Sequence, residues 1–156
     1  MLKINQGLRR IARFFAVMYF LGVIFPVSAH CESEYTQDEA QIHHVLIKQW
    51  DKKESPLTVS PIAIVGDHAI AGWGQGERGG RALLRRAHHG WEVYMCGGED
   101  LTNPKVLEQA GIDAGTAELL ANKLKSAEQA MSSEARKRLS IFEGVVPVEA
   151  NQHHAH

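Results

Sequence analysis

The stretch LTVSPIAIVGDHAIAGWGQGERGGRALLRRAHHGWEVYMC, residues 57–96, decides the fold of this chain. It contains four runs rich in β-branched, aromatic and small apolar residues, and polar or glycine-containing segments separate these runs. The Gly-Asp pair at 66–67 suits a type II′ hairpin turn. GQGERGG at 74–80 predicts a longer glycine-rich connection, and 88–90 predicts a short polar turn. Four strands joined in this way form an antiparallel meander.

Helical patterns flank the four strands on both sides. Before them, a TQDE capping box begins at Thr36, and apolar residues at helical spacing predict a helix over 37–51. Three helical patterns follow the strands, from 103 onward, over 113–131 and over 133–141. FEGVVPVE at 142–149 fits an edge strand. The sequence therefore predicts an α+β fold, with an N-terminal helix packed on a four-stranded antiparallel meander and followed by C-terminal helices.

The first 29 residues have the layout of a secretory signal peptide. They carry four basic and no acidic residues, then an uncharged apolar run from Phe14 to Phe25, and they end in VSA. The apolar run is shorter than the about 20 residues of a membrane span, so an uncleaved anchor is the less favoured alternative. We expect an exported protein with no stable membrane insertion after cleavage. The predicted parts are the signal peptide 1–29, a linker 30–36, a single α+β domain 37–149 and a His-rich tail 150–156.

Removal of the signal peptide changes the charge balance of the chain. Of 17 basic and 18 acidic residues, the mature part keeps 13 basic and all 18 acidic ones, a formal net charge of −5. A nucleic-acid partner is not expected, because such partners favour a basic surface. All nine histidines lie in the mature part. This excess of imidazole in an exported protein indicates metal binding.

Two histidines, a methionine and a cysteine lie close together in AHHGWEVYMCGG. Alternation along a strand places Met95 on the same face as Trp91 and places Cys96 on the other face. His89 and Cys96 are about 23 Å apart in an extended strand, whereas metal–ligand bonds are about 2.0–2.3 Å long. We therefore interpret the stretch as a polar turn followed by a core strand. His88, His89, Met95 and Cys96 are secondary metal candidates that would each need outside partners.

The tail ANQHHAH is the primary metal candidate. His153, His154 and His156 have no hydrophobic neighbours that commit them to a core, so a flexible backbone can direct several imidazoles at one ion. Imidazole suits copper, zinc and nickel. Binding needs neutral imidazole, so affinity should fall as the pH drops through about 6.5. The alternative is a solvated tail without a ligand.

Catalysis has little support in the sequence. We find no G-x-S-x-G, H-E-x-x-H, P-loop or Rossmann motif, and the strand length separates Cys96 from the neighbouring histidines. We therefore expect a protein that is not an enzyme. The exported compartment permits a disulfide between Cys31 and Cys96, and their spacing leaves this pairing open.

The segment KQWDKKESPLTVSPIAIVGDHAIAGWGQGERGGRALLRR, residues 48–86, resembles the copper uptake system-associated proteins, a family of small exported bacterial proteins with a histidine-rich C-terminal tail. The similarity continues through GWEVYMCGGEDL, the alanine-rich helix and FEGVV, and its most specific parts include Trp73, Arg81 and Cys96. The resemblance implies a periplasmic protein linked to copper uptake or handling. It implies a copper transporter or periplasmic copper chaperone as partner, and it supplies no catalytic residues.

A hypothesis of another class remains open. The chain can be read as a periplasmic protein-binding or inhibitor module with no metal role, which recognises its partner through the sheet. A solvent-facing Trp73 or Trp91 would support this hypothesis, because exposed aromatic residues mark interfaces.

Overall fold

The computed structural model describes the backbone of residues 29–148 and the side chains of residues 37–148. The predicted signal peptide, except for its last residue, and the predicted tail lie outside these described residues. Within the described part, no helix is long and apolar enough to cross a membrane.

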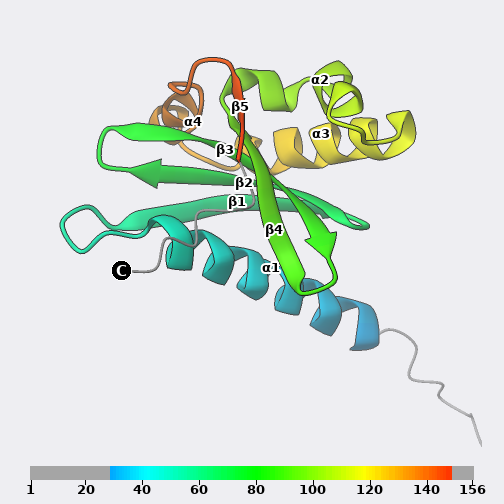
Figure 1. Cartoon of the computed structure of the whole chain (residues 1–156). Helices are drawn as coiled ribbons and strands as arrows, with labels where there is room; N and C mark the ends of the chain where they lie inside the picture. The colour runs from blue at the N-terminus through cyan, green and yellow to red at the C-terminus, as the bar shows by residue number, and fades with distance from the viewer. Residues whose placement is uncertain (1–28, 149–156) are drawn as a thin grey trace, which may run out of the picture.

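An antiparallel meander forms the centre of the molecule (Figure 1). The sheet has the order β1-β2-β3-β4-β5, so each strand pairs with its neighbour in sequence. The strands are β1 (Leu57–Val65), β2 (His68–Gln75), β3 (Arg78–Ala87), β4 (Gly90–Gly97) and β5 (Val145–Pro147). The four-stranded meander is therefore confirmed, and the segment FEGVVPVE supplies a short fifth strand at the edge, as its pattern indicated.

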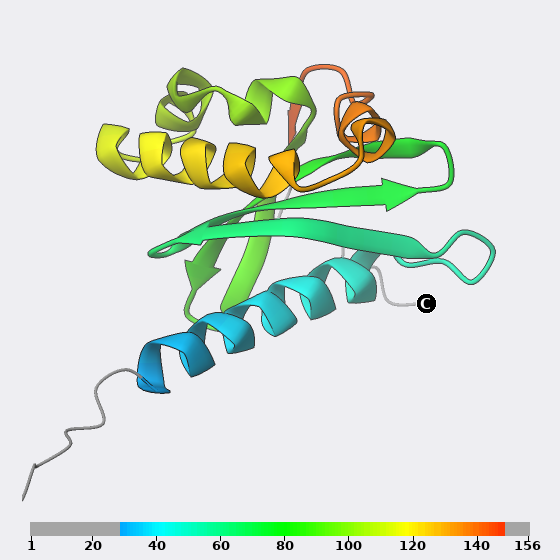
Figure 2. The same cartoon turned by 180° about the vertical axis from the view of Figure 1, so that it is seen from behind.

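Helices cover both faces of the sheet and make a three-layer arrangement (Figures 1 and 2). The long helix α1 (Ala29–Trp50) crosses one face. The opposite face carries η1 (Glu99–Thr102), α2 (Pro104–Gln109), α3 (Ala114–Gln129) and α4 (Ser133–Leu139). The predicted α+β class, with an N-terminal helix on the meander and helices after it, is confirmed.

The two helical layers create two hydrophobic cores that share the sheet. Ile42 and Leu46 of α1 pack against Ala69, Ala71 and Leu84 in the first core. The second core joins Leu120 and Leu124 of α3 to Ile70 and Leu83. Adjacent strand residues thus alternate between the cores, because neighbouring side chains of a strand point to opposite faces. A buried leucine or isoleucine contributes about 1.5–3 kcal/mol relative to an exposed one, so these cores dominate the folding energy.

The start of α1 differs from the prediction. The helix begins at Ala29, so the residues 30–36 that we predicted to be a linker are helical, and Thr36 lies inside the helix rather than at a capping box. The physical reason lies in composition, since residues 29–36 contain neither glycine nor proline to stop upstream propagation.

The prediction of a longer glycine-rich connection over 74–80 is also wrong. β2 and β3 are joined by a two-residue turn, with Gln75 paired to Arg78 and Gly76 in the left-handed region at φ 61°. Gly79 belongs to β3, and a Cβ there would lie 2.7 Å from the backbone oxygen of Arg138. Glycine at this position therefore permits close approach of α4 to the sheet rather than forming a loop.

An irregularity in β4 overturns the predicted face of Met95. Leu83 pairs with Met95 and Leu84 pairs with Val93, which leaves Tyr94 as the extra residue of a β-bulge. Met95 consequently packs in the second core, while Cys96 packs in the first core together with Trp91. Met95 and Cys96 still lie on opposite faces, as predicted, but each lies on the face that was expected for the other.

Candidate functional site

A cavity of about 810 Å³ lies between the C-terminal part of α1 and the sheet. Its apolar walls come from distant parts of the chain and include Trp50 of α1, Trp73 of β2, and Phe142 from the segment before β5. Ligand sites in proteins typically enclose about 300–1,000 Å³ and have mostly apolar and aromatic walls. This cavity is therefore the principal candidate site of the described residues.

Two of the aromatic walls support each other. The rings of Trp73 and Phe142 meet edge to face, with centroids 6.2 Å apart and planes at 78°. Gly80 provides the space for this pair, because a Cβ there would lie 3.0 Å from both Trp73 Cζ2 and Phe142 Cβ. Edge-to-face pairs add about 0.5–1.5 kcal/mol beyond the buried area, so the aromatic wall is pre-formed.

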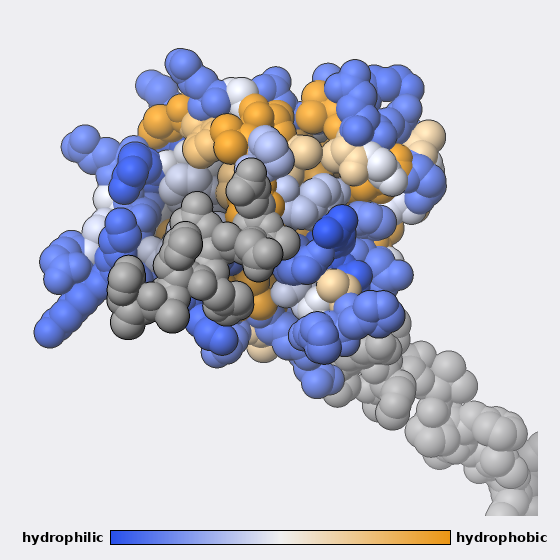
Figure 3. Space-filling model, viewed as in Figure 1, coloured by the Kyte–Doolittle hydropathy of each residue, from blue (hydrophilic) through white to orange (hydrophobic). Residues whose placement is uncertain are grey.

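The side chain of Gln75 fixes one end of the cavity. Its Nε2 donates to the backbone oxygens of Trp50 and Ser55, each at 2.9 Å. The single amide thereby connects β2, the end of α1 and the loop between α1 and β1. These segments lie at the same end of the molecule in Figure 1, where hydrophilic side chains gather on the surface (Figure 3).

Cys96 lines the same cavity as a free, partly buried thiol. Burial raises its pKa to about 11, because the apolar surroundings disfavour the thiolate. The acidic residues after β4 are not among the causes of this shift in the Cys96 pKa. The thiol is therefore protonated and unreactive at neutral pH, and a metal would have to displace its proton to bind.

The last described residues run beside Cys96. Val146 of β5 pairs with Cys96, and the backbone nitrogen of Val148 donates to the oxygen of Tyr94 at 2.9 Å. Val148 itself lines the cavity. The described chain thus ends at the cavity wall, and the segment that follows carries the histidines of the predicted tail.

The structure does not bring the four secondary metal candidates close together. His88 and His89 are exposed in the turn between β3 and β4, while Met95 and Cys96 lie near the opposite end of β4 on different faces. Within residues 37–148, no group of three or more histidine, cysteine, aspartate or glutamate residues could hold a metal. The primary candidates, His153, His154 and His156, lie outside the described residues.

His89 lies near one further histidine. A second, shallower hollow of about 520 Å³ is lined by His44 of α1 and by His89, with Gln41 and Trp91 nearby. The side chain of His44 is exposed. Sequence spacing could not bring these two histidines together, because they meet only through the packing of α1 on β4.

The indole of Trp91 is buried rather than solvent-facing, with 5% of its surface exposed. Its Nε1 donates to Asp38, and the guanidinium of Arg86 stacks 4.6 Å above its ring. Burial of the Asp38 carboxyl acts to raise its pKa, but hydrogen bonds from Arg86 and Trp91 outweigh that effect and lower it. Trp91 therefore fixes α1 to the sheet and is not available as an interface residue, whereas Trp73 is partly exposed in the cavity.

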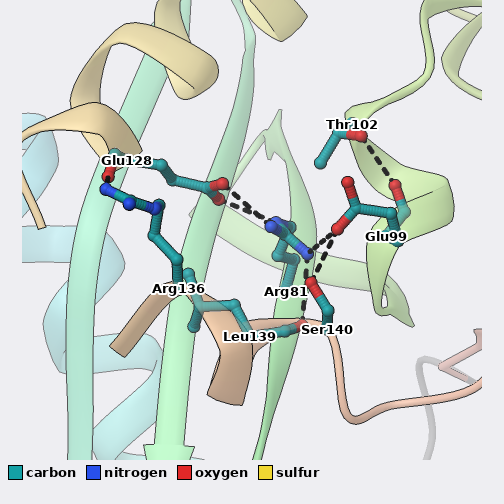
Figure 4. A network of polar contacts seen from close by, with 7 residues as sticks. All are labelled: Arg81, Glu99, Thr102, Glu128, Arg136, Leu139 and Ser140. Carbon is teal, nitrogen blue, oxygen red and sulfur yellow. Dashed lines mark hydrogen bonds and ion pairs between the residues drawn. The ribbon is translucent and has the colours of Figure 1, made fainter. Parts of the chain in front are cut away.

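Sequence reasoning missed a buried ion pair on the opposite face. Arg81 is 1% exposed and donates from its Nε and one terminal nitrogen to the two carboxylate oxygens of Glu128, each at 2.8 Å (Figure 4). Its other terminal nitrogen donates to the backbone oxygen of Leu139 and lies 3.6 Å from Glu99. Glu128 occupies the buried face of α3, four residues after Leu124, and this spacing was the available clue.

No protein-family model, no curated protein and no solved structure matches this chain.

Proposed function

We propose that this chain is a periplasmic copper-binding accessory protein, in which the terminal histidines and the Cys96 thiol hold the ion at the mouth of the cavity. One observation carries the proposal. The described chain ends at Val148 on the cavity wall, and β5 immediately before it pairs with Cys96. The imidazole-bearing tail thus begins at the position of the thiol.

The length of the tail is compatible with such a site. His153 follows Val148 by five residues and His156 follows it by eight. An extended chain covers about 3.3–3.6 Å per residue, which gives a reach of about 17 Å and 27 Å. The terminal imidazoles can therefore return to the cavity mouth without any change in the described fold.

The donor set fits copper chemistry. A thiolate suits Cu(I), and imidazole suits Cu(II) as well as zinc and nickel. Because the pKa of Cys96 is about 11, each metal bound at its sulfur releases a proton near neutral pH. Metal affinity should then rise with pH, both through this thiol and through the histidines. A copper transporter or periplasmic copper chaperone is the partner that we propose for transfer, and no catalytic step is proposed.

Copper titration of the mature chain, residues 30–156, tests the proposal. We expect removal of residues 151–156 to weaken copper binding at least about tenfold, a loss of about 1.4 kcal/mol. Cys96→Ser should weaken Cu(I) binding and leave the Cu(II) affinity less affected. His43→Asn is the matched control, because it removes an exposed imidazole that lies in neither hollow. Equal copper binding with and without residues 151–156 would contradict the proposal.

The aromatic cavity also favours a second candidate, the protein-binding or inhibitor module. Trp73 is partly exposed there and can contact a partner side chain. A partner captured from periplasmic extract equally well with and without a metal chelator would favour this candidate. Loss of capture in Trp73→Ala would assign the contact to the cavity.

A further inference from the structure

We infer that the cavity beside α1 is a binding site for a small amphipathic carboxylate, an organic anion with an aromatic or aliphatic body. This inference is independent of the copper proposal. That proposal uses only Cys96 and the tail, whereas the aromatic walls and the charged end of the cavity remain unused by it.

The walls supply the apolar half of the site. Trp50, Trp73 and Phe142 face the cavity, and the buried side chains of Leu46 and Leu57 complete its lining. The hydrogen bonds of Gln75 and the edge-to-face ring pair hold these walls in place. A flat or linear apolar body can therefore enter without a large ordering cost.

The charged residues of the lining supply the polar half. Lys52 and Arg78 both line the cavity, and no carboxylate from the described part of the chain does so. Neither cation forms an ion pair within residues 37–148. Arg78 offers a planar fork that can bind a carboxylate through two parallel hydrogen bonds. The lining is thus complementary to an anion.

Both cations belong to the same end of the cavity. Arg78 pairs with Gln75, and Gln75 donates to the oxygen of Ser55, which forms a bridge with Lys52. The nearby carboxylate of Asp51 does not line the cavity, and it accepts the backbone N–H of Leu57. The C-terminal oxygen of α1 at Trp50 is likewise occupied by Gln75. These two acceptors therefore have partners other than the cavity. The carboxylates of Glu54 and Glu77, which belong to the two loops at this end, do not line it.

The test uses naphthalene-2-carboxylate and its neutral isostere naphthalene-2-carboxamide as probes. Each probe is titrated by calorimetry into the mature chain in the presence of a metal chelator. We expect the carboxylate to bind at least about tenfold more tightly than the carboxamide. In Lys52→Gln/Arg78→Gln this preference should disappear, while the affinity for the carboxamide stays unchanged. Lys48→Gln is the matched control, because Lys48 is an exposed cation on the last turn of α1 that does not line the cavity.

Indole resonances identify the site directly. The carboxylate probe should shift the indole N–H signals of Trp50 and Trp73, and it should leave that of Trp91, which is bonded to Asp38, unchanged. A shift of the Trp91 indole signal alone, or an equal affinity for the carboxylate and the carboxamide, would overturn the inference. Binding that appears only after residues 149–156 are removed would assign the cavity to the chain's own terminus and would also overturn it. Because the titration contains a metal chelator, failure of the copper proposal leaves this result intact.

Discussion

The guanidinium of Arg81 on β3 and the carboxylate of Glu128 on α3 form two parallel hydrogen bonds in a nearly solvent-free position. Leu139 at the end of α4 and Glu99 of η1 approach the same guanidinium. One side chain of the sheet thus connects three segments that follow the meander. Removal of Glu128 would leave the buried Arg81 with only the longer ion pair to the exposed Glu99, and removal of Arg81 would leave the Glu128 carboxylate without its guanidinium. This loss leads to the first prediction.

Glu128→Ala should lower the free energy of unfolding by about 3–5 kcal/mol, the usual cost of breaking a buried ion pair by removing one partner. The double variant Arg81→Met/Glu128→Leu should lose less stability than Glu128→Ala, because it removes both buried charges. Urea unfolding followed by circular dichroism measures both values. Lys105→Ala, which breaks an exposed pair with Glu108, serves as control and should change stability by less than about 1 kcal/mol. A double variant as unstable as Glu128→Ala would contradict this account.

Asp38 should contribute to stability in a pH-dependent way. Burial acts to raise its pKa, but the hydrogen bonds from Arg86 and Trp91 lower the folded-state pKa below the ordinary value of 3.8. Its contribution is therefore present above pH 3.8 and is lost as the pH falls through the lower folded-state value. Asp38→Asn should be less stable than the parent protein at pH 6 by about 1–3 kcal/mol. The difference should shrink toward pH 3 in thermal unfolding, and a difference that grows on acidification would contradict the assigned partners.

Cys96 should react slowly with alkylating reagents. Its pKa of about 11, compared with an ordinary value of 9.0, leaves about a hundredfold less thiolate at pH 8. We expect the rate with iodoacetamide, measured in Cys31→Ser to isolate one thiol, to rise about tenfold per pH unit between pH 7 and 10. Bound Cu(I) should protect the thiol if copper uses it. A rate at pH 8 equal to that of glutathione would show that the thiol is not buried in this way.

Gly80 should tolerate no side chain. A Cβ at this position would lie 2.9 Å from the backbone oxygen of Gly97 and 3.0 Å from both Phe142 Cβ and Trp73 Cζ2. Gly80→Ala should therefore lower stability by about 1–3 kcal/mol through overpacking and should shift the Trp73 fluorescence. Gly115→Ala is the matched control at the start of α3, where the nearest atom is an ordinary 3.4 Å away. That change should raise stability by up to about 1 kcal/mol, because alanine is the better helix former.

Local patterns were sufficient to predict most of the secondary structure from the sequence. The period-two runs and the Gly66 turn gave the meander, and Asn103 and Asp113 mark helix starts that the structure confirms as N-caps. The errors occurred where packing overrides local pattern. Gly79 looks like a loop residue until α4 is placed against it. The bulge at Tyr94 follows from pairing with β3, which the alternation within β4 does not reveal.

The candidate site was less accessible to sequence reasoning. Cys96 was identified as a possible ligand, but its partners in the cavity come from segments as distant as Leu46 and Phe142. Such convergence depends on how α1 and the C-terminal segment cross the sheet, and no spacing rule encodes it. The cations Lys52 and Arg78 were not considered together because they lie 26 residues apart in the sequence. Only the hydrogen bonds of Gln75 show that the two loops meet.

The placement of Leu83 and Leu84 on opposite faces of β3 has a consequence for how the molecule denatures. Each is completely buried, and each belongs to a different one of the two apolar clusters. The same strand therefore contributes to both clusters, and unfolding of β3 in one cluster also removes its side chains from the other. The whole body should lose its structure in one cooperative transition, with amide exchange in β3 limited by global opening alone.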